Sequence, residues 1–195
     1  MAPIVALLSL MLVAFTQLGM AASSGQHENG VFEAHMDDDG FAVVNRIGDI
    51  SKPSSSWRAG NLTATSARFM ARRAPKADTR SCTKNGAVLT GNDVDMAAYS
   101  LGYTCDIAVG SGQGDAFVSA KGFRYAFYNN VVAYVCNFSG NSQHCLSSEV
   151  ESDLDSVQAL CMNTEGYYNH REWAKGYGYG LYTGSIDFCK DKKNA

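Results

Sequence analysis

The sequence predicts an α+β fold: an antiparallel sheet of about five or six short strands, with two helices packed on one face and three disulfides. Three observations carry this prediction. Residues 121–138 have the pattern of a β-hairpin, two segments beginning near residues 91 and 148 have the apolar spacing of helices, and all six cysteines follow residue 81. About 115 residues bury only a modest core, so we expect the disulfides to supplement it.

Residues 1–22 are predicted to be a secretory signal peptide. A continuous apolar run from Ile4 to Phe15 is followed by Gly-Met-Ala-Ala, which places cleavage near Ala21 or Ala22. The run is too short to span a membrane, and no later segment approaches about 18 consecutive apolar residues. We therefore expect an exported, extracellular protein without a membrane span.

Residues 23–73 are predicted to be a disordered pro-segment. They contain no Cys or Tyr and are rich in Ser, Ala, Gly and Asp, so they cannot bury enough apolar surface to fold alone. The segment ends in Arg72-Arg73, a pair typical of kexin-type processing sites, although two adjacent arginines also occur by chance. We expect cleavage there and a mature disulfide-bonded domain over residues 74–195.

The predicted mature domain contains 10 Lys or Arg and 13 Asp or Glu, a net charge of −3. This balance argues against a basic surface for nucleic acid. No Cys-x-x-Cys pair occurs, so the cysteines indicate disulfides in an oxidising compartment rather than a metal site. We expect a monomer with no metal, no cofactor and no nucleic-acid partner.

The first helix is expected to begin at Asn92, a good N-cap residue, and to end at Gly102. Ser148 and Glu151 have the spacing of a capping box, which predicts the start of the second helix. Its apolar stripe is expected to contain Val150, Leu154, Val157, Leu160 and Cys161. Asp153 and Asp155 are expected on the solvated side.

The hairpin of residues 121–138 is expected to turn at Asn129-Asn130, because Asn tolerates positive φ. This turn fixes the register, with the opposed pairs Phe127–Val132, Tyr125–Tyr134 and Phe123–Cys136. We expect the aromatic face to be the core. Asn137 begins an Asn-Phe-Ser sequon on the opposite face, where a glycan could reach water; the sequence leaves open whether it or Asn61 is glycosylated.

Six cysteines allow 15 disulfide connectivities. Because Cys136 lies on the face expected to meet a helix, it is expected to pair with Cys161. Antiparallel helices would then bring Cys105 to Cys145, and Cys82 would join Cys189 to tie the two ends.

The ribbon Gly176-Tyr177-Gly178-Tyr179-Gly180 alternates with period two, so a strand would place both tyrosines on one face. With Trp173 and Tyr167 they could form an aromatic strip that binds a sugar or a partner protein. The other interpretation is that they fill the core, with the glycines allowing close packing behind them. We expect partial exposure, because neighbouring tyrosines need partners for their hydroxyl groups.

A set of acid–base side chains could cleave RNA: His170, Glu172 and Arg124. His144 and Glu165 are further side chains of the types that this chemistry needs. None of these residues lies in a recognisable motif, and exposed loop side chains explain them more simply. The sequence therefore predicts no catalytic residue, and a non-enzymatic role is favoured.

The signal peptide, the dibasic pro-segment, the six-cysteine domain with NVVAYVCNF and the Tyr/Gly strand resemble small cysteine-rich secreted proteins of filamentous fungi. The order of elements is also distantly similar to killer-toxin-like α/β sandwiches. This resemblance implies a secreted effector or antagonism protein that acts non-enzymatically on an unknown protein or glycan of a host or competitor. The alternatives are a secreted ribonuclease-like toxin and a glycan-binding protein.

Overall fold

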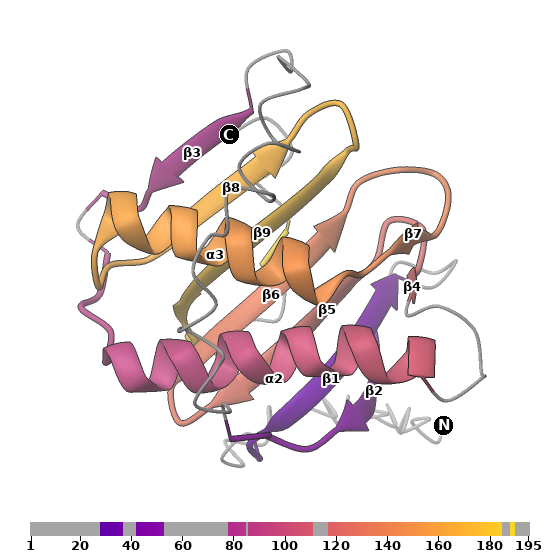
Figure 1. Ribbon diagram of the computed structural model, residues 1–195, viewed down its shortest axis with the longest axis horizontal. Coiled ribbons are helices and arrows are strands. Elements are labelled where there is room, and N and C mark those ends of the chain that lie inside the picture. Colours follow the sequence, from indigo (N-terminus) through magenta and orange to yellow (C-terminus); the bar gives the residue numbers. More distant parts are fainter. Residues whose placement is uncertain are drawn as a thin grey trace, which may run out of the picture.

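The computed structural model describes residues 28–36, 42–52, 78–84, 86–110, 117–184 and 188–189. They form a seven-stranded antiparallel sheet with two helices on one face (Figure 1), which confirms the predicted fold class. The order across the sheet is β2-β1-β5-β6-β9-β8-β3. Its strands are β1 (Gly30–Met36), β2 (Ala42–Gly48), β3 (Thr79–Cys82), β5 (Phe123–Tyr128), β6 (Val131–Asn137), β8 (Gly166–His170) and β9 (Lys175–Leu181). A separate ladder joins β4 (Phe117–Val118) to β7 (Gln143–His144).

The two helices, α2 (Gly91–Gly110) and α3 (Ser147–Cys161), lie side by side on the sheet (Figure 1). The predicted end of the first helix at Gly102 is wrong, because the buried stripe continues from Leu101 to Cys105 and burial outweighs the roughly 1 kcal/mol cost of a helical glycine. The predicted Ser148 capping box is also wrong. The N-cap of α3 is Leu146, and no side chain caps the helix there. No helix in the described part of the chain is long and apolar enough to cross a membrane.

The β5–β6 hairpin has the predicted register and turns at Asn129, whose φ is 52°. Both of its faces are buried, however. The helices cover the face with the small residues Ala126 and Ala133, which let α2 approach the strands closely. The expectation that the helices cover the aromatic face is therefore wrong.

The aromatic face forms a second core on the far side of the sheet. Phe188 lies at its centre, with ring centroids 5.2 Å from Tyr125 and 5.4 Å from Tyr134. The disulfide Cys136–Cys189 fastens the segment that carries Phe188 to β6. The aromatic residues of this layer are Phe32, Phe123, Tyr125, Phe127, Phe138, Tyr134, Tyr167, Tyr182 and Phe188.

All six cysteines are paired, as Cys82–Cys161, Cys105–Cys145 and Cys136–Cys189. The predicted Cys105–Cys145 pair is confirmed, and the predicted Cys136–Cys161 and Cys82–Cys189 pairs are wrong. Cys136 belongs to the aromatic layer, so the sheet separates its sulfur from α3. Cys82, on the edge strand β3, meets the end of α3 instead.

Part of the predicted pro-segment is folded into the sheet. Strands β1 and β2 form a hairpin, and β1 pairs with β5 from Gly30↔Phe127 to Ala34↔Phe123. Val31 and Ala34 are fully buried. The expected disorder of residues 23–73 is thus wrong for this hairpin, because β1 buries Val31 and Ala34 against the rest of the protein instead of folding alone. The signal peptide and Arg72-Arg73 lie outside the described residues and stay predictions.

Candidate functional site

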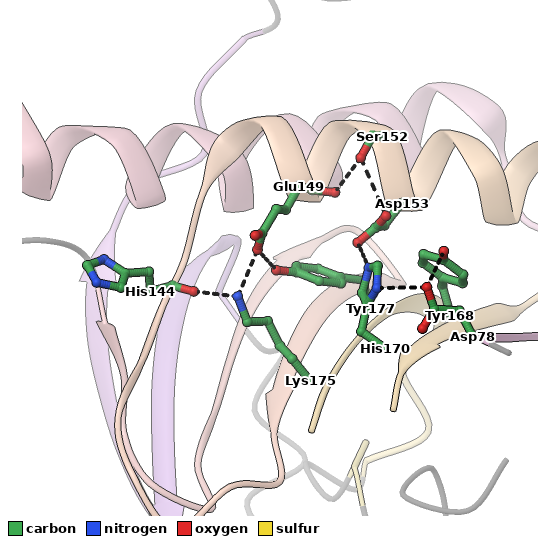
Figure 2. Close-up of polar contacts among 9 residues, drawn as sticks. All are labelled: Asp78, His144, Glu149, Ser152, Asp153, Tyr168, His170, Lys175 and Tyr177. Carbon is green, nitrogen blue, oxygen red and sulfur yellow. Dashed lines mark hydrogen bonds and ion pairs between the residues drawn. The ribbon is translucent and has the colours of Figure 1, made fainter. Parts of the chain in front are cut away.

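Charged side chains from α3, β8 and β9 meet between the helix and the sheet (Figure 2). Asp153 lies three residues after the buried Val150, so it points down from α3 with the apolar stripe. The register of β8 with β9 pairs His170 with Lys175, which places both on the helix-covered face. Asp153, His170 and Lys175 are all buried. We call Asp78, Glu149, Asp153, His170, Lys175 and Tyr177 the charged cluster.

Both ring nitrogens of His170 face carboxylates. Its Nε2 lies 2.7 Å from Asp153 Oδ2, and its Nδ1 lies 3.2 Å from Asp78 Oδ2. The Trp173 ring stacks on the imidazole, with centroids 4.4 Å apart. His170 is 7% exposed, so the protein itself occupies each polar atom of this ring.

The cluster holds a proton more tightly than its members would in water. Burial lowers the pKa of His170, but the hydrogen bond to Asp153 and the charges of Asp153, Asp78 and Glu149 raise the pKa by more. The net pKa of His170 is therefore above its usual value. Burial also raises the pKa of Asp153, and the hydrogen bond and charge of His170 offset this only in part.

Lys175 and Glu149 form the second ion pair of the cluster. Lys175 Nζ lies 2.7 Å from Glu149 Oε2 and also donates to the His144 carbonyl at 2.8 Å. Tyr177 donates its hydroxyl hydrogen to Glu149 Oε2. Burial, followed by the nearby charges of Glu149 and Asp153, holds the pKa of Tyr177 well above its usual value. Each charge below α3 thus has a partner of opposite sign, which buried charges require.

The arrangement can fasten α3 to the sheet, and it leaves no free acid–base atom on His170. Among the described residues, no group of three or more His, Cys, Asp or Glu side chains could hold a metal ion.

The predicted aromatic binding strip is not exposed. Tyr177, Tyr179 and Tyr167 are 0%, 1% and 1% exposed, so this prediction is wrong and the ribbon is core. Tyr179 donates its hydroxyl hydrogen to the Met162 carbonyl at 3.1 Å, which supplies the partner that a buried tyrosine needs. A Cβ at Gly176 would collide with the Tyr167 ring, as the core interpretation required. Of the predicted strip, Trp173 alone reaches the surface, at 37% exposure.

The side chains proposed for RNA cleavage do not form one site. Arg124 is buried beside Glu33, with Nη2 3.2 Å from Oε2, and it also donates to the Phe117 carbonyl. Glu172 is exposed, and the exposed His144 packs against Phe117, with ring centroids 4.3 Å apart. Glu165 accepts a hydrogen bond from the Leu181 amide. Arg124 and His170 therefore have different carboxylate partners, Glu33 for the first and Asp153 with Asp78 for the second.

Asn137 is 2% exposed, and its amide nitrogen is fully used. This Nδ2 donates to the carbonyls of Val118, Ser119 and Asn141 at 3.0, 2.9 and 2.8 Å. An N-linked glycan would attach to the same atom and would have to fit inside the fold. The prediction of a glycan at Asn137 is therefore wrong for the folded protein. Asn61 lies outside the described residues.

Most of the charged cluster differs from the expectation from sequence. The solvated position predicted for Asp153 is wrong, because this residue falls three residues after Val150 and one before Leu154, within the apolar stripe. Lys175 lies two residues before Tyr177 and so shares its face of the strand. These two positions in the apolar pattern indicate burial, but Asp and Lys are usually exposed, and this preference predicts the opposite.

Similarity to known proteins adds no further support to the resemblance with cysteine-rich fungal proteins. The chain matches no protein-family model, no curated protein and no solved structure.

Proposed function

We propose that this is a secreted, disulfide-stabilised effector or antagonism protein that binds a protein or glycan of a host or competitor and does not act by catalysis. The observation that carries this proposal is the environment of His170. Its two ring nitrogens face Asp153 and Asp78 inside the protein. The strongest acid–base candidate of the sequence thus serves the fold.

Export is supported by the cysteines and by the apolar segment at residues 4–15. Three disulfides among 195 residues are typical of proteins that mature in an oxidising compartment. They join strands, helices and the segment around Phe188, so the folded surface is held in one shape. A rigid surface suits recognition, because less conformational freedom is lost on binding.

Two alternatives remain as proposals of other classes. A ribonuclease-like toxin would require Arg124, Glu172 and His170 to act on one substrate, and the separate ion pairs of Arg124 and His170 count against it. A glycan-binding protein is favoured by one observation: the Trp173 ring is partly exposed and is held against His170, as a sugar-stacking platform would be.

The test compares activity with catalysis. Purified full-length protein would be infiltrated into plausible host tissue and added to competitor cultures, alongside a double variant with His144→Ala and Glu172→Gln, both at exposed positions. We expect equal activity of wild type and variant and no cleavage of a structured RNA by either. RNA cleavage by the wild type that is lost in the variant, with the fold retained, would support the toxin instead. Reduced and alkylated protein is the inactive control.

A further inference from the structure

We propose that Met162 and Val88 form a docking tip for an apolar patch, flanked by basic side chains, on a polypeptide partner. This inference deepens the proposed function by naming the surface that binds. The two side chains are 76% and 82% exposed, the highest values among the large apolar residues that the structure describes.

Met162 adopts a backbone conformation that favours glycine. Its φ is 55° and its ψ is −122°, and the Thr164 amide donates to the Cys161 carbonyl at 3.0 Å. These features define a type II′ turn with Met162 at its first central position, where Gly is the usual residue. A glycine there would relieve the backbone and remove an exposed apolar side chain. The presence of methionine despite both disadvantages points to a role for its side chain in solvent.

The backbone around the tip is held rigidly. Tyr179 donates to the Met162 carbonyl, and the Leu89 amide donates to the Asn163 carbonyl at 2.7 Å. Val88 bridges to Thr164, which brings the two exposed side chains onto neighbouring segments. The disulfide Cys82–Cys161 joins the first residue of this turn to β3. The tip is thus presented in a fixed position, which reduces the entropy lost on binding.

The surroundings of the tip are acidic. Residues 82–84, 86–95 and 155–165 contain one base, Lys84, and four acids, which are Asp93, Asp95, Asp155 and Glu165. Asp95, Asp155 and Glu151 also line a groove between α2 and α3. Opposite charge around an apolar contact sets orientation and speeds association, so a partner with basic flanks is complementary. The same charges disfavour an anionic membrane.

The experiment uses a defined probe, a synthetic 14-residue helical peptide with leucines on one face and lysines beside them. The full-length protein would carry ¹³C-methyl methionine, and the Met162 signal is identified by its loss in Met162→Gly. We expect the peptide to shift this signal in the wild type. In Met162→Gly we expect at least tenfold weaker peptide binding, with an unchanged or higher melting temperature. Met162→Leu should retain binding.

Two controls isolate the tip. Ile47→Ser removes a 40% exposed apolar side chain from β2, at the other edge of the sheet, and should leave binding unchanged. A peptide with glutamates in place of the lysines should bind at least tenfold more weakly. Equal binding of wild type and Met162→Gly, an unmoved Met162 signal, or a lower melting temperature of Met162→Gly would each overturn the proposal.

Other occupants of the tip are separate outcomes. Binding to phosphatidylcholine or phosphatidylserine vesicles that disappears in Met162→Gly would assign the tip to a lipid surface. Dimerisation in sedimentation that depends on Met162 would assign it to a second copy. Either result overturns the polypeptide partner. Peptide binding is measured separately from biological activity. If the peptide does not bind but the protein still acts on host or competitor, only the proposal of a docking tip is contradicted. Peptide binding without any such activity contradicts only the proposed function.

Discussion

Asp153 is the nearer of the two carboxylates that hold His170 beneath α3, and with Asp78 and Glu149 it raises the pKa of the imidazole. Asp153 is 2% exposed, so its charge is tolerable only because His170 lies 2.7 Å away. Removing one partner of a buried ion pair leaves the other uncompensated, which costs about 3–5 kcal/mol. The role of this residue in stability therefore exceeds that of the surface acids on the same helix.

We expect Asp153→Asn to lower the free energy of unfolding by about 3 kcal/mol. The matched control is Asp155→Asn, two positions along α3 on its exposed side, which should change stability by less than about 0.5 kcal/mol. Urea unfolding followed by circular dichroism measures both. Similar values for the two variants would show that the cluster contributes little.

The same contacts predict a stability that rises as the pH falls from 8 to 6. The folded protein has a raised pKa at His170, so this contribution is complete below the unfolded pKa of about 6.5 and is lost as pH rises through the higher folded value. Each additional proton bound by the folded state changes stability by about 1.4 kcal/mol per pH unit. Urea midpoints at pH 6, 7 and 8 should therefore decrease in that order. Asp153→Asn should flatten this dependence, and an equal slope in that variant would contradict the assignment.

The hairpin formed by β1 and β2 is the element that completes the sheet. Glu33 on β1 supplies a charge for Arg124, which is 5% exposed, and it also accepts from the Ser119 hydroxyl at 2.9 Å. Beyond β1 and β2, the Ser51 amide donates to the Ser100 hydroxyl on α2 at 3.0 Å. Without the hairpin, β5 would be an edge strand with a buried arginine left unpaired.

We expect a fragment of residues 74–195 to be much less stable than the full chain. Loss of the Val31 contact removes about 1.5–3 kcal/mol and the unpaired Arg124 costs about 3–5 kcal/mol, a large part of the usual 5–15 kcal/mol. Urea unfolding and size-exclusion chromatography of the two proteins test this. Glu33→Gln in the full chain isolates the ion pair from the loss of the strands. Equal stability of fragment and full chain would show that the hairpin is dispensable.

Local signals predicted some elements and missed others. The register of β5 with β6 follows from one tight turn, and two helices follow from apolar spacing, so these were predictable. The face of the hairpin that meets the helices could not be predicted. One face carries small residues and the other aromatic residues, and both faces are buried. The β1–β2 hairpin depends on pairing with a strand about 90 residues later, which no local pattern records. The charged cluster could not be predicted because its members come from α3, β8, β9 and the residue before β3, and only the tertiary fold brings them together.

Three disulfides connect the layers of the whole molecule. Cys105–Cys145 joins the end of α2 to the approach to α3, whereas Cys136–Cys189 fastens the Phe188 segment to the aromatic layer. Their sequence separations, 40 and 53 residues, close loops of similar entropy. A difference between their contributions to the free energy of unfolding must therefore come from the packing that each disulfide maintains.

We expect Cys136→Ala with Cys189→Ala to lower the free energy of unfolding by about 4 kcal/mol. The loss should exceed that of Cys105→Ala with Cys145→Ala, because Phe188 contacts Phe123, Tyr125, Tyr134 and Tyr182 and would lose its anchor. Urea unfolding of the two double variants gives the comparison. A smaller loss for the Cys136 pair would show that the Phe188 segment stays packed without its bond.

All three disulfides lie within residues 82–189, so the described contacts of the β1–β2 hairpin with the rest of the protein are noncovalent. In the intact chain the connecting residues keep the hairpin at a high effective concentration, on the order of millimolar. A cut at Arg72-Arg73 would turn this internal pairing into an association of two chains, which dilution opposes. Native mass spectrometry of such a product would show both chains together, and denaturing conditions would separate them without a reductant. At concentrations below their dissociation constant the hairpin would dissociate, and the time since cleavage would then determine whether the edge of β5 is covered.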